Sequence, residues 1–290
     1  INVFVNLFMG ISLGANVLAA RFYAAGKDEE MSKTVHTAIM IALISGIVMG
    51  VVGVIFARGA LEIMGTPDDV IGLSTIYMRI YFCGMPFFML YNYGAAILRA
   101  VGDTKRPLIF LIISGCINAL LNLFFVIVCR LGVIGVAIAS IIAQYISAAL
   151  IIRFLMKTYG SYGLHMKDIA IDRDAAAAVL RIGVPAAIQY SLFAIANICI
   201  QTSINSFSHV VVEGNSAATN ADSLIYDMMA AFYTACTSFI AQNLGARKKE
   251  RVLSTFFITL AYSFLMGLVL GVYQHSWTMP QPPPGASEKV

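Results

Sequence analysis

Eight long apolar stretches follow one another along the 290 residues of this sequence, and each can cross a lipid bilayer as a helix. A hydrocarbon core of about 30 Å needs roughly 20 helical residues. Apolar residues make up 59% of the chain and charged residues only 12%, which is too apolar for a water-soluble domain. The stretches are Ile1–Ala25, Thr34–Ala57, Val70–Leu98, Leu108–Val128, Val133–Met156, Ala175–Phe207, Ala217–Leu244 and Val252–Tyr273.

Helices are the structure that these stretches predict. An unpaired backbone group costs several kcal/mol in hydrocarbon, and a helix pairs such groups within one segment. The alternating strands of about ten residues that a membrane barrel needs are not visible. The expected fold is therefore an all-α polytopic membrane protein in contact with the lipid bilayer.

The basic residues between the stretches are distributed very unevenly. When the loops are assigned alternately to the two sides, one side holds fifteen Lys and Arg residues and the other holds only Arg58 and Arg130. This asymmetry predicts that the basic loops are cytoplasmic and explains the net charge of +4 by anionic lipid, without nucleic acid. No obligate protein partner is evident. The basic loops are Gly26–Lys33, Arg99–Pro107, Lys157–Asp174 and Gly245–Arg251.

Two segments 222 positions apart resemble each other. Both lie at the cytoplasmic end of one stretch and continue into the next, in the same membrane direction, which indicates a parallel repeat and a two-lobe bundle. A period of this length implies a complete protein of about twice that length, so we expect the chain to be truncated at both ends. The alternative is that two basic loops merely look alike. The matched pairs are Ala15 with Thr237, Ala19 with Ala241, Ala24 with Ala246, Lys27 with Lys249, Asp28 with Glu250, Ser32 with Ser254, and Thr37 with Thr259.

The repeat divides the chain into four predicted parts. Residues 1–157 form an N-lobe of five membrane helices that lacks its first helix, and residues 158–174 form a cytoplasmic linker. Residues 175–273 begin a C-lobe with three membrane helices. We expect the proline-rich segment 274–290 to be a non-helical tail, either a native extramembrane end or a non-native junction.

Motifs of enzyme chemistry are absent from the sequence. There is no phosphate-binding loop, no nucleophile elbow and no His or Cys spacing typical of a metal site. The five cysteines lie within or beside apolar stretches and are odd in number, which favours packing over disulfides. We therefore expect neither an enzyme nor a bound cofactor or metal.

Two carboxylates, Asp222 and Asp227, lie inside an apolar stretch. A carboxylate at membrane depth could bind and release a proton, or accept a sodium ion, and Asp227 is the deeper candidate for ion coupling. Asp222 could instead be interfacial. Asp227 could instead hydrogen-bond a neighbouring helix or pair with Arg79.

Polar amides form stripes on otherwise apolar stretches. Such a stripe faces either a water-filled cavity or a hydrogen-bonding neighbour helix, and both readings stay open. Nearby aromatic and methionine side chains, including Phe193, Tyr226, Met229 and Tyr233, could line a cavity for a flat organic cation or simply pack. The candidate cavity residues are Asn118, Asn122, Gln144, Gln189, Asn197, Gln201 and Tyr91.

Several loop motifs resemble those of the multidrug and toxic compound extrusion (MATE) family. Leu98–Pro107 (LRAVGDTKRP) resembles its LRGxGDTKxP segment, and Gly132–Ala139 with Gln144 resembles its GxxGAAxAT…Q segment. Gly183-Val184-Pro185 opens a helix like the seventh helix of the family. Two further segments match: Ala241–Ala246 resembles the GQNLGA motif, and Met64–Asp69 resembles the loop after the third helix.

The resemblance implies a fold of twelve helices in two lobes, of which this chain would supply helices two to nine. It also implies a secondary-active antiporter that exports organic cations and other drugs in exchange for H⁺ or Na⁺ from the cell (inner) membrane. The acid that many prokaryotic members carry in helix one lies outside this chain. The glutamate that some sodium-coupled members carry in helix seven has no counterpart here, so the coupling ion stays open. The alternative function is a flippase for a lipid-linked saccharide, whose anionic headgroup would need a cationic cavity. Apart from Arg21, Arg153 and Arg181, which are counted with the cytoplasmic loops, Arg79 is the only Lys or Arg inside an apolar stretch.

Overall fold

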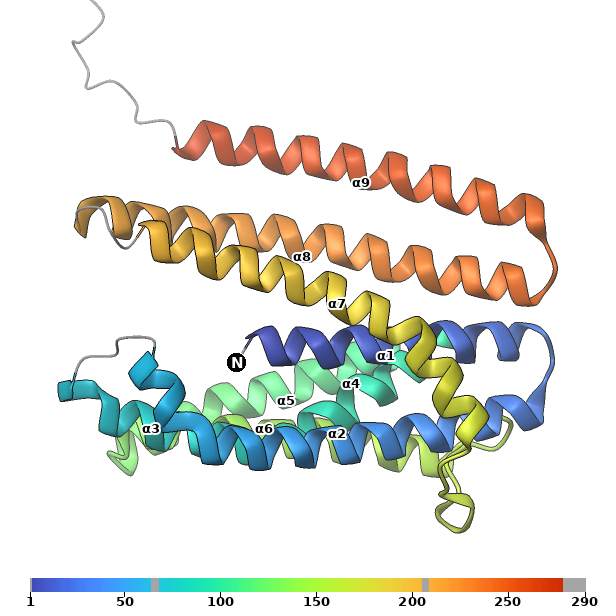
Figure 1. The fold of residues 1–290 in the computed structure, drawn as a ribbon, viewed down its shortest axis with the longest axis horizontal. Helices are drawn as coiled ribbons and strands as arrows, with labels where there is room; N and C mark the ends of the chain where they lie inside the picture. The colour runs from blue at the N-terminus through green and yellow to red at the C-terminus, as the bar shows by residue number, and fades with distance from the viewer. Residues whose placement is uncertain (1, 64–67, 205–208, 279–290) are drawn as a thin grey trace, which may run out of the picture.

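The computed structural model describes residues 2–63, 68–204 and 209–278, and this part of the chain is a bundle of long helices (Figure 1). No strand occurs in these three ranges. The helices are α1 (Asn2–Ala24), α2 (Asp28–Ile63), α3 (Asp68–Cys83), α4 (Met85–Ala100), α5 (Lys105–Leu123), α6 (Gly132–Lys157), α7 (Arg173–Ile204), α8 (His209–Gly245) and α9 (Lys249–Thr278).

Most of these helices can span a membrane. Six described helices (α1, α2, α5, α6, α7 and α9) are long and apolar enough, and the bent pair α3 and α4 makes a seventh span if counted together. The remaining long helix, α8, is not among them, although it covers the predicted stretch Ala217–Leu244. The predicted all-α polytopic membrane fold is confirmed.

The predicted single span Val70–Leu98 is broken in the structure. α3 and α4 meet at an angle of 44° around Gly84. Pro86 stands at the start of α4, where its missing N–H group costs no hydrogen bond. A side chain at position 84 would collide with Oε1 of Gln144 on α6. Because Gly84 has no side chain, Gln144 can lie directly against the backbone at the break between α3 and α4.

Two other helix ends differ from the prediction. After Leu123, α5 continues into a turn of π-helix, Phe124–Val128. α9 extends to Thr278, so the first five residues of the predicted non-helical tail 274–290 are helical. The prediction overlooked that these five residues contain no proline, whereas Pro280 and its neighbours lie outside the described residues. Most of the motif segment Met64–Asp69 lies outside them as well.

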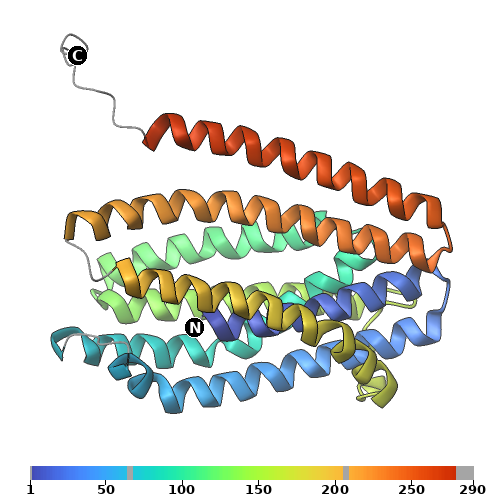
Figure 2. The same cartoon turned by 45° about the horizontal axis from the view of Figure 1, so that its top comes forward.

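Three basic connections lie at the same end of the bundle. Residues 25–27, the linker 158–172 and residues 246–248 are found there in Figure 1, whereas α2 ends and α8 begins at the opposite end. We call this the basic end. The view in Figure 2 shows the same arrangement of neighbouring antiparallel helices. Three of the four predicted basic loops thus lie at one end of the bundle, as alternation predicts.

α1 is the central helix of the described bundle. It packs against α2, α4, α7 and α8, and its buried residues join a core with Met31, Met85 and Tyr93. Against α7 the two backbones touch, because small residues recur four positions apart on both helices. They are Gly10 and Gly14 on α1, and Gly183 and Ala187 on α7. α9 packs mainly against α8.

Candidate functional site

A pocket of about 170 Å³ lies between α7 and α8. Its lining residues recur with the helical repeat, at i, i+1 and i+4 on α7 and at i, i+3, i+4 and i+7 on α8, so each set forms one face directed at the other helix. α7 contributes Gln189, Tyr190 and Phe193, and α8 contributes Tyr226, Met229, Ala230 and Tyr233.

Two aromatic pairs connect the walls of this pocket. The rings of Tyr190 and Tyr233 meet edge to face with centroids 6.3 Å apart, and those of Phe193 and Tyr226 lie 6.2 Å apart at a tilt of 53°. Met229 contributes a polarisable sulfur, whose Sδ accepts a hydrogen bond from Ser263 on α9 at 3.2 Å. Aromatic faces and thioethers bind flat apolar groups, and ring faces also attract organic cations.

The two predicted acids lie on different sides of α8. At about 100° per residue, Asp222 falls within about 40° of Tyr226 and Met229 around the helix, whereas Asp227 is about 100° and about 160° away from them. Both side chains are exposed in the structure, and neither lines the pocket. Helix geometry therefore favours Asp222 over Asp227 as the acid on the pocket face.

The structure does not gather the predicted cavity residues into one site. Among the predicted cavity residues whose side chains the structure describes, only Gln189 lines the pocket between α7 and α8. On α5, the amide of Asn122 donates to Oδ1 of Asn118 at 3.0 Å, as expected for a stripe with a four-residue period. Asn197 is exposed on α7, and Gln201 is on the same helix, but its side chain lies outside the described residues.

Two other predicted cavity residues have structural partners. The hydroxyl of Tyr91 donates to the carbonyl of Pro107 at 2.9 Å and so connects α4 to the first turn of α5. Gln144 packs against Gly84 at the break between α3 and α4. Tyr190 lines the pocket between α7 and α8, although the sequence analysis did not name it. Its position beside Gln189 and three residues before Phe193 could have indicated that it shares their helix face.

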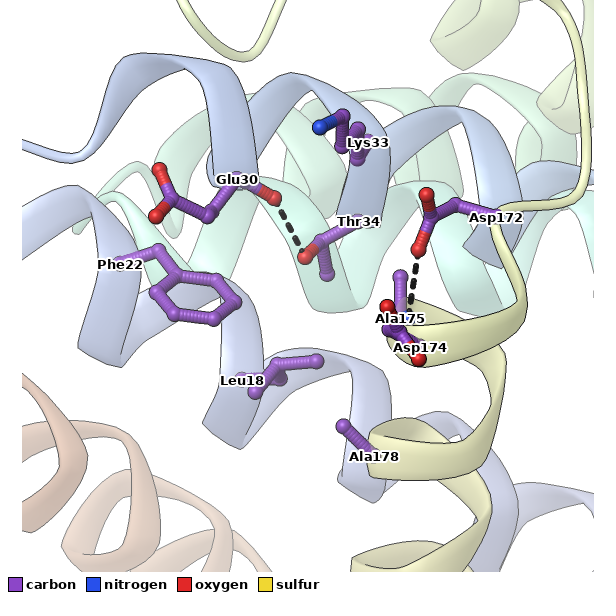
Figure 3. Close-up of a pocket in the computed structure, with 9 residues that line it drawn as sticks. All are labelled: Leu18, Phe22, Glu30, Lys33, Thr34, Asp172, Asp174, Ala175 and Ala178. Carbon is purple, nitrogen blue, oxygen red and sulfur yellow. Dashed lines mark hydrogen bonds between the residues drawn. The ribbon is translucent and has the colours of Figure 1, made fainter.

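A second cavity, of about 210 Å³, lies at the basic end between α1, α2 and the start of α7 (Figure 3). Its carboxylates belong to Glu30, Asp172 and Asp174. Glu30 pairs with Lys27 at 3.0 Å, and Oδ1 of Asp172 accepts from the backbone N–H of Ala175 at 2.8 Å, which caps α7. Asp172 thus caps the start of α7, and Glu30 forms an ion pair in the first turn of α2.

His36, His165 and Asp168 are the described residues that come closest to a metal site. Their potential ligand atoms lie within 4.8 Å of one another. However, Nδ1 of buried His36 must donate to the carbonyl of Ser32 at 2.7 Å, since that oxygen only accepts, so Nε2 accepts from the backbone N–H of His165 at 3.0 Å. Because its lone pair is already used, His36 anchors the linker to α2 and is poorly suited to hold a metal.

Comparison with known proteins decides the family. The family model described as MatE matches residues 1–124 and 185–280. The chain belongs to the MatE family. The resemblance seen in its loops is therefore confirmed.

Relatives and solved structures in the MatE family cover most of this chain. A protein called probable multidrug resistance protein YoeA, from Bacillus subtilis (strain 168), is 28% identical over 92% of the chain, which spans 59% of that relative. A protein called FAD transporter, from Shewanella oneidensis, is 23% identical over 91% of the chain and is covered to 60%. The chain thus spans less than two thirds of these relatives.

A solved structure shows the same fold. It is described as the outward-facing conformation of a multidrug resistance MATE family transporter, and it superposes with a TM-score of 0.82 at 19% identity. The superposition covers 93% of this chain and 60% of that one. The MatE fold is thus present in this chain.

Proposed function

We propose that the protein is a secondary-active exporter of amphipathic organic cations, driven by exchange with H⁺ or Na⁺. The observation that carries this proposal is the aromatic pocket between α7 and α8 in a member of the MatE family. Ring faces, a thioether and the amide of Gln189 suit a flat cation with a polar substituent. The name of one relative, probable multidrug resistance protein YoeA, supports drug-like substrates in general.

Exchange requires that the ion and the drug favour opposite states of the transporter. A ligand shifts a conformational equilibrium only by its difference in affinity for the two states. We assign ion coupling to Asp222, because it follows the pocket face of α8 one turn before Tyr226. A carboxylate that is neutralised by a proton or a sodium ion would release a bound cation, and its negative charge would favour cation binding.

The proposed setting is the cell membrane, the inner membrane in a bacterium with two, with the basic end in the cytoplasm. The positive-inside asymmetry of the loops supports this orientation. With this orientation the proposed substrate leaves the cell.

The flippase alternative is less well supported. An anionic headgroup would require cationic groups in the cavity, and the seven residues that line the pocket include no Lys or Arg. The FAD transporter relative shows that an anionic substrate has been attributed to the wider family, so anions belong in the test.

Export from inverted membrane vesicles with ethidium as probe tests this function in the full-length protein. We expect ethidium uptake into the vesicles to follow an imposed proton or sodium gradient. Asp222→Asn should lower this uptake, with Asp227→Asn as the matched control on the same helix. No ethidium movement under either gradient, together with movement of FAD, would replace the cation proposal. Equal effects of the two Asn variants would remove Asp222 as the coupling residue.

A further inference from the structure

Three polar side chains connect α8 to the helices of the predicted N-lobe close to the basic end. Asn16 on α1 donates to the carbonyl of Ala96 on α4 at 2.7 Å, and its Oδ1 accepts from the hydroxyl of Ser238 on α8 at 2.7 Å. Gln242, one turn further along α8, donates to the carbonyl of Ala100 at 2.7 Å. We call Asn16, Ser238 and Gln242 the polar bridge.

The geometry of the polar bridge fixes the orientation of the Asn16 amide. The carbonyl of Ala96 can only accept, so the amide NH₂ of Asn16 faces it, and Oδ1 is left to accept from Ser238. The single hydroxyl proton of Ser238 has a second acceptor, the carbonyl of Thr234 at 3.0 Å, and the shorter distance of 2.7 Å favours Asn16. Asn16 is 1% exposed and Ser238 is 7% exposed, so water does not replace either partner in this conformation. A buried amide that loses its partners is costly, because its desolvation is no longer compensated.

Asn16 and Ser238 occupy equivalent positions of the internal repeat. They are separated by 222 residues, the same offset that pairs Ala15 with Thr237 and Ala19 with Ala241. Two equivalent residues can touch only close to the axis that relates the two copies. The contact therefore places the pseudo-twofold axis between α1 and α8 at the level of the bridge.

The backbones of α1 and α8 also approach closely beyond the bridge. Gly245 lies against the carbonyl of Arg21, and a side chain at position 245 would collide with this oxygen. Ala241, between Ser238 and Gly245, is 3% exposed and belongs to the same core as Ala15 and Ala19. α1 and α8 are thus sealed together from Asn16 to the basic end.

The seal lies between the aromatic pocket and the basic end. On α8 the pocket residues precede the bridge, and Tyr233 is five residues, or about 7.5 Å, before Ser238. Around α8, Ser238 is about 80–180° away from the four pocket residues of this helix. The bridge therefore closes the face of α8 that meets α1, at a level between the pocket and the basic end.

We propose that the hydrogen bonds of the polar bridge keep the basic end of the bundle closed, and that this end opens only when Asn16 releases Ser238. We call the bridge in this role the latch, and the closed contact of α1 with α8 the basic-end gate. This inference rests on the proposed function, because opening of the basic end admits a substrate only if the protein is an exporter. Breaking the latch shifts the balance towards conformations open at the basic end. Asn16 has the larger effect, because it contacts both α4 and α8.

Cysteine accessibility tests the latch without any transport. In full-length protein with its native cysteines replaced, reconstituted in nanodiscs, Ala241→Cys reports opening through its rate of reaction with a charged maleimide. We expect Asn16→Ala to raise this rate about tenfold, as loss of a buried hydrogen-bonding partner implies. Ser238→Ala, which leaves the bond to Ala96 intact, should raise it about threefold.

The matched control is Asn243→Ala, because the amide of Asn243 donates within its own helix, to the carbonyl of Phe239. This variant should label at the parent rate. A second reporter, Ala95→Cys in the core of α4, should stay slow in every variant, which separates gate opening from general unfolding. If both reporters label fast in Asn16→Ala, that variant is unfolded, and the labelling rate of Ser238→Ala then decides whether the latch exists.

Equal labelling rates for Ser238→Ala, Asn243→Ala and the parent would overturn the latch. Because labelling needs neither substrate nor gradient, a protein that labels as expected but exports no ethidium retains the latch and loses the proposed function. The reverse result, with export intact and no change in labelling, retains the function and removes the latch.

Discussion

Replacing Gly14 by Ala tests whether the crossing of α1 and α7 depends on backbone contact. A Cβ atom at position 14 would lie 2.7 Å from the backbone nitrogen of Gly183 and closer still to the carbonyl oxygen of Val179. Ordinary contact needs about 3.4 Å or more, and backbone atoms cannot rotate away as side chains can. The two helices must therefore separate along the crossing.

The expected cost is the difference between two effects. Overpacking of a tight interface costs about 3 kcal/mol at the upper end of the usual range, which suits a clash with backbone atoms. The better helix propensity of Ala returns about 1 kcal/mol. We therefore expect Gly14→Ala to lower the free energy of unfolding by about 2 kcal/mol.

Gly115→Ala on α5 is the matched control. No atom lies within 4 Å of the added Cβ at that site, so the helix propensity term acts alone and should stabilise by up to about 1 kcal/mol. Unfolding of the purified protein in mixed micelles, followed by fluorescence across a denaturant series, measures both variants. If Gly14→Ala proves as stable as Gly115→Ala, the close contact between α1 and α7 is refuted.

Three other predictions address single contacts. Gly84→Ala should cost less than Gly14→Ala in the same unfolding assay, because its clash is with the movable end of Gln144; an equal or larger loss would contradict this. His36→Leu should lower the free energy of unfolding by about 1–3 kcal/mol, since it leaves the backbone N–H of His165 without its partner, whereas the Ser32 carbonyl keeps its backbone bond within α2. His165→Gln should be nearly neutral, because the bond to His36 uses only the backbone of residue 165. Tyr233→Ala should weaken ethidium binding severalfold, measured by fluorescence anisotropy, and Tyr233→Phe should retain it because the ring face is kept; equal losses would instead assign the interaction to the hydroxyl.

Hydropathy alone predicts the helices because each apolar stretch has only one good way to satisfy its backbone in lipid. It does not reveal the break at Gly84, because the 29 residues of Val70–Leu98 stay apolar on both sides of the bend. Pro86 was visible, but a proline can also begin or kink a continuous helix, and only the close packing of Gln144 shows what the break accommodates.

The candidate site was only partly predictable for a related reason. A polar side chain in an apolar stretch shows that some partner exists, but the partner is selected by the fold. Asn118 and Asn122 form a hydrogen bond within one helix, as their four-residue spacing allows. Asn16 forms hydrogen bonds with residues 80 and 222 positions away. The only sequence feature that pointed to these partners was the repeat, which aligns Asn16 with Ser238.

The contacts of α1 with α7, of α1 with α8, and of α7 with α8 together suggest how the pocket could affect the latch. α7 is held against α1 by backbone contact at Gly183 and Ala187, directly before the pocket residue Gln189. On α8 the polar and backbone contacts with α1 run from Ser238 to Gly245, beyond the pocket residues of that helix. A ligand that enters between α7 and α8 therefore displaces α8 more easily than α7, and a rigid helix transmits this displacement to Ser238. We expect ethidium to raise the labelling rate of Ala241→Cys in a saturable manner, and Tyr233→Ala to shift the midpoint to higher ethidium concentration. A labelling rate that does not change with ethidium would show that the pocket and the latch are independent.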